Sequence, residues 1–108
     1  AAYELWSHRY RPTAAITFFE QVGLGFFITI QQLGGSIPDD LSVVTFDEVP
    51  GSSHFNPALT TLKMPSDQIA RVAVDALTQL ISGNASPGSI RMKISIQLEV
   101  RTSTQPLG

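Results

Sequence analysis

Short β-prone runs and longer helical patterns follow one another along the chain. Residues 41–48 begin with an apolar run that contains Leu41, Val43, Val44 and Phe46 and has no alternation of charge. Such a run is typical of a strand buried on both faces, as inside a parallel sheet. It ends at two carboxylates, Asp47 and Glu48, and a Pro-Gly turn follows.

A strand, a helix and a second strand are predicted before Asp47. Residues 13–18 are a strand candidate, and residues 21–33 have a helical apolar pattern that Gly34-Gly35 ends by a left-handed cap. Residues 13–47 therefore predict a βαβ unit with a right-handed crossover. Residues 1–9 are predicted to be the last turns of another helix, which Arg11-Pro12 ends.

The helix over residues 21–33 is apolar almost all round, unlike a surface helix with a single apolar stripe. One stripe contains Val22, Phe26, Ile30 and Leu33, and a second, displaced stripe contains Leu24, Phe27 and Ile28. If one stripe packs on the sheet, the other needs a partner. Burial within the domain and a subunit interface remain two open hypotheses.

The second half of the chain predicts a strand, a helix and a long strand. Residues 59–64 are β-prone, and a helix with one apolar face is expected from Ser66, as its N-cap, to Ser82. Residues 91–101 alternate strictly between apolar and polar side chains, which predicts a half-exposed strand of eleven residues. Because strands are usually about half that length, we expect a bend or a segment that serves two sheets.

Composition narrows the functional classes. The chain has 108 residues, 43% of them hydrophobic, with a net charge of −2, no cysteine and seven scattered basic residues. One domain with a modest core is expected, and strong binding of nucleic acid by this chain is not. Disulfides and thiolate chemistry are excluded, and neither a membrane-spanning run nor a signal peptide is present. The first residues resemble a helix already under way, so we expect a fragment of a longer protein.

No pattern of catalytic, metal-binding or cofactor-binding residues emerges. A triad of Ser52 or Ser53 with His54 and Asp47 is too local, because triads bring residues from separate elements. Asp39-Asp40 lacks metal-ligand spacing and is typical of a turn. No glycine pattern of a phosphate-binding loop follows a strand. The sequence therefore predicts no enzyme, no metal and no cofactor.

Asp47 is the candidate binding residue because of its position. In open α/β sheets, ligands bind beyond the carboxyl ends of the strands, where Asp47 is the first polar side chain. The other hypothesis is a carboxylate that caps a turn or a neighbouring helix. Phe18 and Phe19 end the preceding strand at the same edge, and an aromatic wall beside a carboxylate suits a sugar or a purine.

Five segments together resemble the C-terminal third of LacI/GalR-family transcription repressors, in order and spacing: Arg11-Pro12-Thr13-Ala14, Gly25, residues 37–48, residues 57–62 and residues 101–104. The resemblance implies an α/β fragment of a type I periplasmic-binding-protein-like fold, with a parallel sheet and the effector between two subdomains. Residues 1–63 would belong to the C-terminal subdomain. Residues 64–93 would form a hinge crossing and a helix of the N-terminal subdomain, and residues 94–108 a return strand and C-terminal tail.

The resemblance also implies site residues. The family's effector-contacting aspartate matches Asp47, while Phe19-Glu20 and Met64 stand where the family has more polar residues. Asp47, Phe19, Phe18 and Met64 are thus the expected effector-binding residues, and a ligand less polar than a simple sugar is possible. The expected dimer interface consists of Leu24, Phe27, Ile28 and Phe55.

The function implied is ligand sensing and dimerisation in a cytoplasmic LacI-type regulator. It would bind a small effector, a sugar or related metabolite, form a homodimer, and reach operator DNA through an N-terminal helix-turn-helix that this chain lacks. The alternative is a periplasmic sugar-binding protein that feeds an ABC transporter. The sequence upstream of Ala1 would decide between them, because only the regulator has a DNA-binding head.

Overall fold

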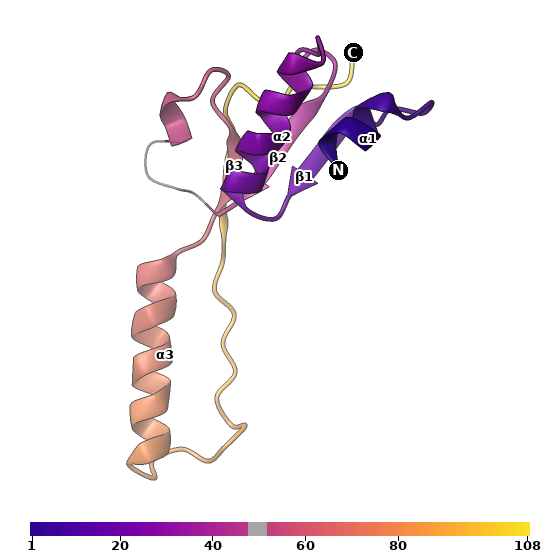
Figure 1. Cartoon of the computed structure of the whole chain (residues 1–108). Coiled ribbons are helices and arrows are strands. Elements are labelled where there is room, and N and C mark those ends of the chain that lie inside the picture. The colour runs from indigo at the N-terminus through magenta and orange to yellow at the C-terminus, as the bar shows by residue number, and fades with distance from the viewer. Residues whose placement is uncertain (48–51) are drawn as a thin grey trace. The chain divides into compact units, whose positions relative to one another are not determined.

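A computed structural model of the chain describes residues 1–47 and 52–108 (Figure 1). The chain divides into two compact units, one of residues 1–64 with 98–108 and the other of residues 65–97. The elements are, in order, α1 (Ala2–Ser7), β1 (Ala14–Thr17), α2 (Glu20–Gln32), β2 (Ser42–Phe46), the 3₁₀ helix η1 (Ser52–His54), β3 (Thr60–Lys63), α3 (Ser66–Ile81) and β4 (Gln97–Glu99).

The first unit is built on a sheet with the strand order β1-β2-β3-β4. β1 pairs with β2, and β2 with β3, both in parallel, with Thr17 level with Thr45 and Phe46 level with Leu62. α2 connects β1 to β2, so the predicted βαβ unit and the α/β class with a parallel sheet are confirmed (Figure 1). Gly34 adopts the left-handed conformation expected after the helix, with φ of 82°.

β2 is buried on one face only among the described residues. Val43 and Thr45 are fully buried on the side of α2, whereas Ser42, Val44 and Phe46 on the other side are half-buried. The expectation of burial on both faces is therefore wrong for the second face, which no described helix of the first unit covers. The core beside α2 consists of Phe26, Phe27, Ile30, Ile37, Leu41, Val43 and Leu59.

Gly23 determines which face of α2 meets the sheet. A Cβ atom at this position would collide with Thr45 Cγ2 and lie 2.8 Å from Thr17 Oγ1, so the helix approaches the strands closely there. Phe26, Phe27 and Ile30 lie three, four and seven residues further on and are buried on the same face. The predicted stripes were therefore grouped wrongly, because Phe27 belongs to the core and Val22 is 55% exposed.

The segment after β4 joins β2 to β3 through Ser103, which is fully buried. Its hydroxyl donates to the Val43 carbonyl at 2.6 Å and accepts from the Thr60 N–H at 2.7 Å. Its backbone accepts from the Val43 N–H at 2.9 Å and donates to the Ala58 carbonyl at 3.0 Å. This one residue therefore connects the amino-terminal halves of both strands.

The second unit contains α3, whose predicted extent is confirmed within one residue. The prediction of Ser66 as N-cap is wrong, since Pro65 precedes the helix and no side chain caps it. No residue of α3 is fully buried, and Leu77 and Ile81 on its apolar face are 57% and 80% exposed. Among the described residues, no helix has the length and apolar character that a membrane span requires.

The predicted strand over residues 91–101 is mostly absent. Within it, only Gln97–Glu99 forms a strand, β4, at the edge of the sheet of the first unit. Strict alternation predicts two faces, but a strand also needs a partner for its backbone hydrogen bonds. Residues 91–96 have no such partner strand among the described residues.

We expect Gly23→Ala to destabilise the protein by about 1–2 kcal/mol, because the overpacking against Thr45 exceeds the gain in helix propensity. Gly25 is the matched control on the same helix, since a Cβ there meets nothing within 4 Å. Gly25→Ala should leave stability unchanged or raise it by up to about 1 kcal/mol. Chemical denaturation measures both, and equal effects of the two substitutions would contradict the close approach.

Ser103→Ala should destabilise the protein by about 2–4 kcal/mol, because the Thr60 N–H and the Val43 carbonyl lose a buried partner. Ser42→Ala is the control: the Ser42 hydroxyl accepts only the longer 3.2 Å bond from the Gln105 N–H and is half-buried. Its removal should cost less than about 1 kcal/mol. A loss below that value for Ser103→Ala in denaturant titrations would show that the hydroxyl does not hold the strands.

Candidate functional site

Aromatic and charged side chains gather where the three parallel strands end. Phe18 and Phe19 follow β1, Phe46 ends β2 just before Asp47, and Lys63 ends β3. The strand register brings these ends to one edge of the sheet. This is the edge at which open parallel sheets bind their ligands.

Phe18 is the centre of an aromatic cluster. Its ring is stacked on that of Phe46, with centroids 5.9 Å apart and planes at 12°, and it meets the Phe19 ring edge-on at 4.9 Å and 86°. Both geometries lie in the favourable range for aromatic pairs. Phe18 is nevertheless 72% exposed and Phe19 51% exposed. The cluster is therefore ordered by its own contacts while facing solvent.

Phe46 is the member of this cluster that was not predicted from the sequence as a site residue. Its pairing with Phe18 depends on the register, because Thr17 lies opposite Thr45 and so Phe18 lies level with Phe46. Once two parallel strands are assigned, aligning the last residue of each would have revealed the pair. Without that register, Phe46 is one more apolar residue of a strand.

Asp47 is exposed and has a backbone φ of 65°, in the left-handed region that aspartate, asparagine and glycine tolerate best. Its N–H donates to the Leu62 carbonyl at 3.0 Å, which fixes it at the end of both β2 and β3. Ligand contact and turn capping both stay predictions for its carboxylate. Glu48 and the predicted turn after it lie outside the described residues.

The other expected effector residues differ in exposure. Met64 follows β3 at the same edge and is half-buried. Glu20 follows Phe19 as the first residue of α2, and at 2% exposure it belongs to the interior. The Thr17 hydroxyl is also buried and donates to the Phe19 carbonyl at 3.4 Å. The exposed chemistry of this edge is therefore the aromatic cluster together with Asp47 and Lys63.

The expected interface residues are not all on the surface. Leu24 is half-buried, and Ile28 and Phe55 are 45% and 37% exposed. Phe27 is 6% exposed and packs in the core, so the prediction that it contacts a partner subunit is corrected. Val22 and Ile28 are the exposed large apolar residues of α2, and they lie on opposite sides of its buried face.

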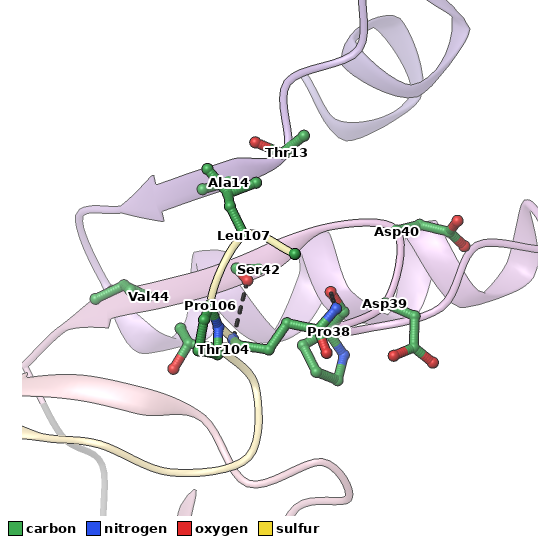
Figure 2. A pocket seen from close by; sticks show the side chains of 12 residues that line it. Thr13, Ala14, Pro38, Asp39, Asp40, Ser42, Val44, Thr104, Pro106 and Leu107 are labelled. Carbon is green, nitrogen blue, oxygen red and sulfur yellow. Dashed lines mark hydrogen bonds between the residues drawn. The ribbon is translucent and has the colours of Figure 1, made fainter.

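A cavity of about 430 Å³ lies at the opposite edge of the sheet (Figure 2). The turn over residues 36–40, the starts of β1 and β2 and the C-terminal segment line it. Gln105 holds that segment in place, with its N–H on the Ser42 hydroxyl and its side chain on the Pro38 carbonyl, both at 3.2 Å. None of the expected effector residues lines this cavity.

Asp39 and Asp40 have the turn role that the sequence predicted. Their carboxylates accept from the Ser36 hydroxyl at 3.4 Å and the Ser36 N–H at 2.8 Å. In the part of the chain that the structure describes, no three side chains come together that could hold a metal ion.

Residues 1–104 match the family model of the periplasmic binding protein-like domain. The lactose operon repressor of Rhizobium radiobacter is 36% identical over 73 residues, which are 68% of this chain and 65% of that protein. The HTH-type transcriptional repressor PurR of Vibrio vulnificus (strain CMCP6) is 36% identical over 75% of this chain and 24% of the repressor. The chain thus spans only part of these relatives, which are repressors and not enzymes.

Solved structures of LacI-type regulators also match this chain. A LacI-type transcription regulator from Bifidobacterium animalis subsp. lactis DSM 10140 matches 98% of this chain and 38% of its own, with a TM-score of 0.83 and 34% identity. A LacI family transcriptional regulator from Arthrobacter sp. FB24, in complex with lactose, matches 96% of this chain and 38% of its own, with a TM-score of 0.81 and 27% identity.

Proposed function

We propose, since this chain belongs to the family of periplasmic binding protein-like domains found in LacI-type transcription regulators, that it carries one wall of the effector site of such a regulator. Asp47 accepts a hydrogen bond from the effector, and Phe18 and Phe19 provide its apolar contact surface. Met64 completes the wall at the end of β3. Effector binding then shifts the relative orientation of two subdomains and thereby the DNA-binding heads.

The observation that carries this proposal is the coincidence of Asp47 and the aromatic cluster at the carboxyl edge of a parallel sheet. An exposed carboxylate next to exposed rings supplies both terms of small-molecule recognition, a directional polar contact and an apolar surface. The lactose complex of the Arthrobacter regulator supports an effector of carbohydrate size.

The named relatives also favour a regulator over a periplasmic transport protein, because both the Rhizobium and the Vibrio protein are repressors. A regulator of this type works as a homodimer in the cytoplasm and reaches operator DNA through a helix-turn-helix in another part of the protein. Ile28 is exposed and lies one turn from the half-buried Leu24 on α2, and this apolar pair supports a dimer contact there. Phe55 is proposed to extend it.

Asp47→Asn should weaken effector binding by at least about tenfold, because a hydrogen bond to a charged acceptor is worth about 1.5–3 kcal/mol. Asparagine tolerates the positive φ of this position, so the fold should be unaffected. A thermal-shift screen of sugars and nucleobases on the intact protein identifies a ligand, and calorimetry then gives the two affinities.

The control for this experiment is Asp39→Asn, which removes the same charge at the opposite edge of the sheet. It should bind the ligand as tightly as the wild type. Equal affinities of the Asp47→Asn variant and the wild type would contradict the assignment of Asp47 to the effector site.

Ile28→Asp should dissociate the proposed dimer, raising its dissociation constant at least about tenfold, because a buried charge without a partner costs several kcal/mol. Tyr10→Asp is the control, since Tyr10 is 75% exposed and lies outside α2. Analytical ultracentrifugation of the intact protein distinguishes the states. A monomeric wild type, or a dimer unaffected by Ile28→Asp, would exclude this interface.

A further inference from the structure

The aromatic cluster is arranged as an unfinished stack. Phe46 covers one face of the Phe18 ring in a nearly parallel orientation, and Phe19 meets its edge. With 72% of Phe18 exposed, the outer face of its ring remains open to solvent. A further flat ring placed on that face would continue the stack in the same offset geometry.

Few polar groups accompany these rings. Among the described residues, the edge presents the carboxylate of Asp47 and the ammonium of Lys63, at the ends of neighbouring strands. The hydroxyl of Thr17, the residue before Phe18, is buried and already donates to the Phe19 carbonyl. Glu20 is likewise in the interior. In the part of the chain that the structure describes, this wall therefore offers much ring surface and few hydrogen-bonding groups.

A wall with much ring surface and few hydrogen-bonding groups favours a ligand that presents an aromatic ring. A sugar can stack its C–H face on the phenyl rings of the wall, but it needs partners for the several hydroxyls at its edge, and a hydroxyl that is buried without one costs about 1–3 kcal/mol. An aromatic ring has no such groups on its face and gains dispersion and quadrupole contacts. One edge donor on the ligand is enough to engage Asp47.

We infer that the effector of this protein carries an aromatic or heteroaromatic ring, which stacks on the outer face of Phe18 while a donor group at its edge binds Asp47. The inference rests on the proposed effector site and specifies the chemical class of its ligand. An aryl glycoside and a free nucleobase both have this chemistry. Phe18 is then the residue that determines specificity, and Asp47 provides the polar anchor.

Matched probes on the intact protein test this inference by calorimetry. One arm compares phenyl with methyl β-D-glucoside and phenyl with methyl β-D-galactoside, and the other compares adenine with ribose. We expect the aromatic member of at least one pair to bind about five- to tenfold more tightly. The arm in which this preference occurs identifies the source of the ring.

Three variants separate ring stacking from simple apolar contact. Phe18→Leu keeps an apolar side chain and should abolish the preference, whereas Phe18→Tyr keeps the ring and should retain it. Ile16→Ala is the matched control, because Ile16 lies two residues earlier on the same face of β1 and is 73% exposed. It should leave the preference unchanged. Melting temperatures close to that of the wild type confirm that the variants fold.

The outcomes distinguish this inference from the proposed function. If a methyl glycoside or ribose binds in an Asp47-dependent manner without any gain from an aromatic ring, the ring inference is overturned and the effector site stands. If the preference falls equally in Ile16→Ala and Phe18→Leu, the face packs against another part of the protein, which also overturns it. If no probe binds the wild type, the effector site and the ring inference both fail.

Discussion

The hydroxyl of Ser103 connects β2 and β3, and the rest of the first unit depends on it. Buried without solvent, it accepts from the N–H of Thr60 and donates to the carbonyl of Val43. Around it, Thr45, Thr60 and Thr61 are also at most 2% exposed. A buried polar network of this kind has directional bonds, so it favours one strand register over others more strictly than apolar packing does. That register determines which residues reach the carboxyl edge.

On the face of the sheet that α2 covers, the packing is restricted just as strictly, because Gly23 has no side chain. Because Gly23 lets α2 approach Thr45 and Thr17, the helix can bury only the face that contains Phe26, Phe27 and Ile30. Val22 and Ile28 are left exposed as a consequence of that choice of face and not because of their own pattern. One small residue thus decides both the core and the surface that a partner subunit would meet.

The sequence was sufficient to predict the local elements. It was not sufficient to predict features that depend on contacts between segments distant in the chain. The βαβ unit followed from hydrophobic period, turn residues and the glycine cap, all of which act within a few residues. Phe27 was misplaced because α2 is apolar all round, and only the contact at Gly23 selects the face. The predicted strand over residues 91–96 does not form, because alternation of apolar and polar residues does not by itself provide a neighbouring strand. Asp47 was predicted as a site residue from its position alone, whereas Phe46 required the register that Ser103 helps to set.

In this chain, the residues that stabilise the fold are therefore different from the residues of the proposed site. The buried hydroxyls of Ser103 and Thr61 donate to backbone carbonyls of β2, so they stabilise the fold and do not face a ligand. The edge keeps the exposed groups, Phe18, Phe19 and Asp47, which contribute little to burial. Substitutions of exposed residues usually change stability by less than about 0.5 kcal/mol. If the proposed effector site is correct, ligand preference can change at Phe18 and Phe19 while the hydrogen bonds of Ser103 hold the strands in place, provided that position 47 keeps a residue that tolerates a positive φ.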